Sequence, residues 1–126
     1  MKIGFLGGGN MAAAMIGGLH QGPAIVVVEP DTAKGAALAE HYGVATEIAP
    51  AALFACDVIV LAVKPQQLRA ALSGWPALRP EQLVISVAAG VRAADIGRWL
   101  GGHAAIVRCM PNTPALVGAG DRKSVV

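Results

Sequence analysis

The feature that most constrains the fold of this chain is a run of three glycines at residues 7–9. The run separates the apolar segment 2–6 from an alanine-rich segment that begins at Asn10. Consecutive glycines weaken both strands and helices, so they favour a tight turn between one element and the next. We therefore expect a strand, a turn and a helix. Asn10 is placed to cap that helix, and Met11, Met15 and Leu19 recur on it every four residues.

Strand-like and helix-like segments alternate along the rest of the chain. Strands are expected at 2–6, 24–28, 44–46, 57–63, 83–88 and 105–109, and helices at 10–20, 31–41, 49–54, 66–72 and 93–100. The segments AIVVV and DVIVLAV are apolar almost throughout, which is typical of parallel strands that are covered on both faces. Short connections in this order predict βαβ units, and hence an α/β fold with a doubly wound parallel sheet of the Rossmann type.

Composition narrows the class of protein further. The 126 residues are one domain's worth, 55% of them are apolar and only 14% are charged, which excludes a disordered chain. The formal charge of +2 comes from scattered residues, and aromatic residues make up 4%, so we expect no nucleic-acid partner. Residues 3–19 resemble the apolar centre of a signal peptide, but six glycines interrupt them. We expect no membrane association and a cytoplasmic location.

The cysteines and histidines show no pattern of a metal site or of a disulfide framework. Cys56 and Cys109 are far apart in the sequence, and His20, His41 and His103 lack ligand spacing. We expect both cysteines to be small buried residues in a reducing compartment, and we expect no bound metal.

The glycine run has the spacing of a dinucleotide-binding fingerprint, Gly7-x-Gly9-x-x-Ala12. In such a fingerprint the first glycine allows the turn, the second allows close approach of a pyrophosphate, and the small third residue lets helix and strand pack closely. An acidic residue is expected about 20 positions later, and Glu29 follows Gly9 by 20 residues. The alternative is a tight turn that binds no ligand.

Glu29 also bears on the choice of cofactor. A carboxylate at the end of the second strand favours the ribose hydroxyls of NAD over the 2′-phosphate of NADP. Lys34 is the nearby cation, and a turn could direct Glu29 to solvent. Both NADH and NADPH therefore stay open at this point.

Two further segments follow predicted strands, at the edge where doubly wound sheets bind ligands. The residues of 62–65 (AVKP) and 87–90 (VAAG) are mostly small, so a flat ring could lie against their backbone. Lys64 could serve as a catalytic amine, although most lysines in such places are solvated surface residues. The rigid segment 110–114 (MPNTP) is either an ordinary turn or a loop beside the same crevice, where Asn112 offers a donor and an acceptor.

Four segments, taken in order, resemble the pyrroline-5-carboxylate reductase family: IGFLGGGNMAAAMIGGL, LAVKPQQL, VISVAAGV and RCMPNTPALVGAG. The resemblance implies reduction of the imine of 1-pyrroline-5-carboxylate to L-proline by NADPH or NADH. It assigns to cofactor binding Leu6, Gly7, Gly8, Gly9, Asn10, Met11, Val28, Glu29, Pro30, Ala62, Val63, Lys64, Pro65, Val87, Ala88, Ala89 and Asn112. It assigns no catalytic residue in this chain.

The resemblance covers residues 1–120, which are expected to form the dinucleotide-binding domain. In the family a helical domain follows, which binds the substrate and forms the homo-oligomer. The last six residues, DRKSVV, depart from the family and match a translated sequencing adapter, so we expect 121–126 to be an artefact of a truncated record. On that basis the chain alone should bind cofactor weakly and not turn over. The alternatives are a dehydrogenase of the hydroxy-acid type and a non-catalytic dinucleotide-binding module.

Overall fold

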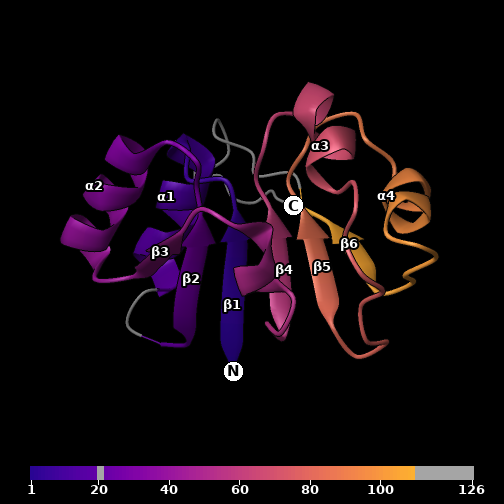
Figure 1. Ribbon diagram of the computed structural model, residues 1–126, viewed down its shortest axis with the longest axis horizontal. Coiled ribbons are helices and arrows are strands. Elements are labelled where there is room, and N and C mark those ends of the chain that lie inside the picture. The colour runs from indigo at the N-terminus through magenta and orange to yellow at the C-terminus, as the bar shows by residue number, and fades with distance from the viewer. Residues whose placement is uncertain (20–21, 110–126) are drawn as a thin grey trace, which may run out of the picture.

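The chain folds around one six-stranded parallel sheet. The computed structural model describes residues 1–19 and 22–109. Its elements are β1 (Lys2–Leu6), α1 (Asn10–Leu19), β2 (Ala24–Val28), α2 (Thr32–Tyr42), β3 (Ala45–Glu47), the 3₁₀ helix η1 (Pro50–Leu53), β4 (Val58–Leu61), α3 (Pro65–Ala71), β5 (Leu83–Ser86), α4 (Ala93–Trp99) and β6 (Ile106–Arg108). The strand order is β3-β2-β1-β4-β5-β6 with every pairing parallel, which confirms the predicted doubly wound fold (Figure 1).

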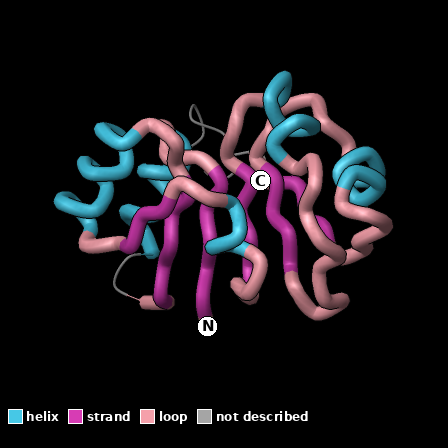
Figure 2. The backbone as a smooth tube through the Cα atoms, viewed as in Figure 1, coloured by secondary structure: helices cyan, strands magenta, loops and turns pink. Residues whose placement is uncertain are grey.

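Helices cover both faces of the sheet (Figure 2). The side chains of the central strands alternate between two clusters of buried residues, one on each face of the sheet. In β4, Ile59 and Leu61 pack with residues of η1, α3 and α4, whereas Val60 between them packs with residues of α1 and α2. A strand that is buried on both sides needs apolar residues at every position. This explains why the central segments of the sequence are apolar throughout.

The buried face of α1 differs from the prediction. Ala12 and Ile16 are fully buried, whereas Met11 is 40% exposed and Met15 and Leu19 are only partly buried. The helix starts directly after the glycine turn, so a small residue such as Ala12 fits closest to the sheet. Asn10 is the first residue of the helix, and the carbonyl oxygen of Gly9 accepts the N–H of Ala13, so the backbone of Gly9 takes the capping position.

The predicted segments 57–63 and 83–88 extend past the ends of the strands that form. β4 ends at Leu61 and β5 at Ser86, and the residues that follow leave the sheet at its carboxyl edge. The prediction that both cysteines are buried is half right. Cys56 is buried under η1, but Cys109 follows the edge strand β6 and is exposed. The expectations for Asn112 and for residues 121–126 lie outside the described residues.

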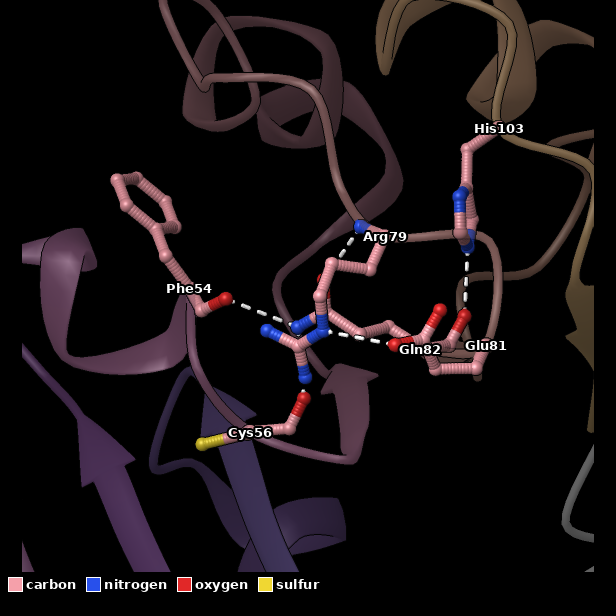
Figure 3. A network of polar contacts seen from close by, with 6 residues as sticks. All are labelled: Phe54, Cys56, Arg79, Glu81, Gln82 and His103. Atoms are coloured by element: carbon pink, nitrogen blue, oxygen red, sulfur yellow. Dashed lines mark hydrogen bonds and ion pairs between the residues drawn. The ribbon is translucent and has the colours of Figure 1, made fainter.

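A buried glutamine ties together the loops at the opposite edge of the sheet (Figure 3). The amide nitrogen of Gln82 donates hydrogen bonds to the carbonyl oxygens of Phe54 (2.9 Å) and Cys56 (2.8 Å). Its amide oxygen accepts the backbone N–H of Arg79 at 2.7 Å. The backbone oxygen of Gln82 also lies 2.6 Å from Nε2 of His103. Gln82 therefore joins the segment before β4 to the loop before β5.

Candidate dinucleotide site

The glycine turn lies where the chain changes direction in the sheet. β1 is flanked by β2 on one side and by β4 on the other, so the turn after β1 stands between two diverging crossovers. Ligands of doubly wound sheets bind at this point, outside the carboxyl ends of the strands. Gly7 has φ 102°, and its N–H donates to the carbonyl of Val28 at 2.9 Å. A Cβ on Gly7 would lie 2.9 Å from the carbonyl oxygen of Ala62, so only glycine fits here.

Gly8 is held by the second strand. Its N–H donates to Oε1 of Glu29 at 2.8 Å, and a Cβ on it would lie 2.9 Å from Cδ1 of Leu38 in α2. The other carboxylate oxygen of Glu29 accepts the N–H of Asp31 at 2.9 Å. Glu29 therefore fixes the turn instead of extending into solvent.

Gly9 is different, because nothing in the described part of the chain lies within 4 Å of the place where its Cβ would be. Its φ is not positive, so neither packing nor backbone strain requires a glycine. The space in front of Gly9 is open, and the first N–H groups of the ten-residue helix α1 follow it directly. Such N–H groups and the positive end of the helix dipole bind phosphate. Gly9 therefore fits a turn that leaves room for a pyrophosphate.

A pocket of about 510 Å³ opens in front of this turn. It is lined by Leu6, Gly7, Gly8, Gly9, Val28, Glu29, Pro30, Lys34, Ile48, Pro50, Ala62, Val63, Lys64, Gln67 and Ala71. The lining comes from the ends of β1, β2 and β4, the segment after β3, and helices α2 and α3. Its size and its mainly apolar walls with a few polar groups are typical of a cofactor pocket.

Ten of the residues assigned to the site from the sequence line this pocket, in the three segments 6–9, 28–30 and 62–64. Asn10, Met11 and Pro65 stand exposed at the first turns of α1 and α3, outside the lining.

The residues after β5 contribute to the core more than to the pocket. Val87 and Ala88 are 6% and 3% exposed, and their side chains pack in the two clusters on either side of the sheet. Ala89 is exposed and does not line the pocket. Any contact that Val87 and Ala88 make with a ligand would have to use their backbone. Asn112 lies outside the described residues.

Five pocket residues were absent from the sequence assignment: Lys34, Ile48, Pro50, Gln67 and Ala71. A signal was available for Ile48 and Pro50, because they follow β3 at the same carboxyl edge that pointed to segment 62–65. Gln67 and Ala71 are four residues apart and so share one face of α3. Lys34 lies in the first turn of α2, three residues after the cap Asp31.

The chemical character of the pocket favours binding and orientation. Its charged side chains are Glu29, Lys34 and Lys64, and both lysines are exposed. The described residues contain no group of three or more His, Cys, Asp or Glu that could hold a metal ion. No described helix is long and apolar enough to cross a membrane.

Fold and pocket together define this chain as a Rossmann-type dinucleotide-binding domain. The family model described as coenzyme F420-dependent NADP oxidoreductase matches residues 2–90, and the chain belongs to this family. The resemblance to pyrroline-5-carboxylate reductases is also confirmed. The chain is 46% identical over 125 residues to the enzyme of that name from Pseudomonas aeruginosa, and 42% identical over 126 residues to that from Escherichia coli. Each match covers 94% of this chain but 46% and 47% of the relative, so the chain spans about half their length.

Solved structures agree with the sequence comparisons. A pyrroline-5-carboxylate reductase from Coxiella burnetii superposes with a TM-score of 0.74 at 39% identity, over 91% of this chain and 45% of that one. The Plasmodium falciparum pyrroline carboxylate reductase, solved with NADP bound, gives a TM-score of 0.70 at 28% identity over 94% of this chain and 45% of that one. The NADP in that structure and the description of the matching family agree with a nicotinamide dinucleotide as the class of cofactor.

Proposed function

We propose that this chain is the cofactor-binding domain of a pyrroline-5-carboxylate reductase, which reduces 1-pyrroline-5-carboxylate to L-proline with NAD(P)H. The observation that carries the cofactor part is the open space at Gly9, directly before the first N–H groups of α1 and inside the 510 Å³ pocket. The names of the curated relatives support the substrate. In this proposal the protein acts in the cytoplasm as a homo-oligomer, and nucleic acid is not a partner.

The described residues would hold the cofactor in two parts. The β2 and β3 side of the pocket, with Glu29, Pro30 and Ile48, would receive the adenosine, and the turn at 7–9 would receive the pyrophosphate. Segment 62–64 would lie toward the nicotinamide, where it shields one ring face from water. When bound, the reduced nicotinamide supplies the hydride, and the chain contributes position and orientation. Lys64 orients or attracts the ligand as an exposed cation, and we assign it no proton transfer.

A chimera tests whether this chain serves as the cofactor domain of an imine reductase. Residues 1–120 would be joined to the carboxy-terminal half of the Pseudomonas aeruginosa relative, which this chain does not match. We expect the chimera to oxidise NAD(P)H when 1-pyrroline-5-carboxylate is added, and not to reduce NAD(P)⁺ with small hydroxy acids. The 126-residue chain alone should show no steady turnover.

Two results would contradict the proposal. A folded chimera that binds NAD(P)H but does not reduce the imine would contradict the assignment of this domain to the reductase. Failure of the folded 126-residue chain to bind either dinucleotide in a titration up to millimolar concentrations would remove the cofactor part of the proposal. Because the titration uses the 126-residue chain, it tests the cofactor part of the proposal even if the chimera does not fold.

A further inference from the structure

The carboxylate of Glu29 is fixed at one end of the pocket by two backbone N–H groups. Oε1 accepts from Gly8 at 2.8 Å and Oε2 accepts from Asp31 at 2.9 Å. The backbone N–H of Glu29 donates to the carbonyl of Glu47 at 2.9 Å, so the residue is anchored at both its main chain and its side chain. The side chain of Glu29 is half-buried, and turning its carboxylate toward solvent would break the two hydrogen bonds that it accepts from Gly8 and Asp31.

The position of this carboxylate sets which ligand can lie against it. Glu29 lines the same pocket as Gly9 and Pro30. Each carboxylate oxygen accepts one hydrogen bond in the structure and can accept another. A ribose with free 2′ and 3′ hydroxyls offers two O–H donors for these places. A 2′-phosphate offers no donor at neutral pH and brings a second negative charge to the same spot.

Lys34 is the group that could offset this repulsion, since it lines the pocket on the same side. Its side chain is exposed, and no carboxylate of the described chain forms an ion pair with it. An exposed ammonium is screened by salt and pays side-chain entropy when it is held in one place. The fixed, half-buried carboxylate of Glu29 should therefore repel a 2′-phosphate more strongly than the exposed ammonium of Lys34 attracts it.

We propose that Glu29 makes this site selective for NADH over NADPH, by accepting the ribose hydroxyls and repelling a 2′-phosphate. This inference rests on the proposed function and deepens it. It runs against the cofactor in the description of the matching family and against the NADP bound in the Plasmodium falciparum structure. The selectivity is thus a property of this chain's own pocket.

Two pairs of ligands isolate the effect of the 2′-phosphate. We would titrate the 126-residue chain with AMP against adenosine 2′,5′-bisphosphate, and with NADH against NADPH, and follow the backbone amide signals by NMR. In each pair the ligands differ only by the 2′-phosphate, and the first pair needs no nicotinamide contacts. In both pairs we expect the dissociation constant of the ligand without the 2′-phosphate to be lower by about tenfold or more.

Four substitutions separate the charge at this position from other effects. Glu29→Gln should bring the ratio of affinities close to one, whereas Glu29→Asp, which keeps the charge, should keep the preference for NADH. Glu47→Gln removes an equal charge from an exposed residue that does not line this pocket, so its ratio should stay that of the wild type. Adding Lys34→Ala to Glu29→Gln should lower the affinity for NADPH more than that for NADH.

The outcomes distinguish this inference from the proposed function. Equal or tighter binding of NADPH by the wild-type chain would overturn it, even if the chimera reduces the imine. A Glu29→Gln variant that loses both dinucleotides in equal measure would also overturn it, since Glu29 would then be only a support of the turn. If the chimera prefers NADH but does not reduce the imine, the inference about Glu29 stands and the proposed function is contradicted. If the folded chain binds neither dinucleotide, both the inference about Glu29 and the cofactor part of the proposed function are contradicted.

Discussion

A Cβ on Gly7 would lie 2.9 Å from the carbonyl oxygen of Ala62, because the glycine turn is wedged between the ends of β2 and β4. Gly7 also has φ 102°. Gly7→Ala should therefore combine backbone strain with a clash against backbone that cannot move away, and lower the free energy of unfolding by about 3 kcal/mol. Urea unfolding followed by circular dichroism measures this.

Gly43 provides the matched control for Gly7. It has φ 70° at the end of α2, and nothing in the described chain lies within 4 Å of its Cβ position. Gly43→Ala should thus show the effect of backbone strain alone, and lower the free energy of unfolding by about 1 kcal/mol. Equal losses at the two positions would contradict the close approach of the turn to β4.

Gly4 in the centre of β1 allows η1 to pack directly on the sheet. A Cβ there would lie 2.8 Å from Sγ of Cys56 and would also overlap the side chain of Leu53. We expect Gly4→Ala to cost about 2 kcal/mol of stability through overpacking. Because Cys56→Ala removes one of the two overlaps, the double variant should lose less than the sum of the single losses. Strict additivity in denaturant unfolding would count against this contact.

The buried amide of Gln82 joins the loops before β4 and β5 through three hydrogen bonds to the backbone. Gln82→Leu removes these hydrogen bonds and leaves the three backbone groups unpaired. We expect the free energy of unfolding to fall by about 3 kcal/mol. Gln82→Glu should be at least as damaging, since it buries a charge and removes both donors. Glu81→Gln is the control: its exposed ion pair with Arg79 is screened by solvent, so this variant should unfold almost like the wild type. Thermal unfolding of the four proteins separates these cases.

The two cysteines should differ in their reaction with thiol reagents. Cys109 is exposed, whereas Cys56 is fully buried and burial raises the pKa of its thiol. The thiolate is the reactive form, so a raised pKa and lack of access both slow Cys56 at neutral pH. With a chromogenic disulfide reagent, one thiol per chain should react in the folded state and two in denaturant. Rapid reaction of both in the native protein would contradict the burial of Cys56.

The sequence predicted the order of the elements well because the central strands are buried on both faces. Such strands are apolar at every position, and glycine and proline separate them from the helices. The face of α1 was harder to predict, since Met11, Met15 and Leu19 follow the same four-residue spacing as the truly buried Ala12 and Ile16. Spacing alone does not reveal that the neighbouring turn leaves room only for a small residue.

The lining of the pocket was predictable where a segment carries its own signal in the sequence. The glycine spacing and Glu29 pointed to the turn, and strand ends pointed to segment 62–64. Gln67 and Ala71 were not predictable in this way, because only the packing of α3 over β4 brings them to the pocket. The two hydrogen bonds that fix Glu29 depend on how β1, β2 and the start of α2 meet, so the sequence left its direction open.

The central claim, that the turn at Gly9 leaves room for a pyrophosphate, is tested most directly by titrating NADH into the wild-type chain and the Gly9→Ala variant, with backbone amides followed by NMR. Nothing in the described chain contacts the added methyl group. The free energy of unfolding of the variant should therefore lie within about 0.5 kcal/mol of that of the wild type. We predict saturable binding by the wild type, with the largest shifts at residues 7–11, and an affinity about tenfold or more lower in Gly9→Ala. Equal affinities in two equally stable proteins would contradict the account.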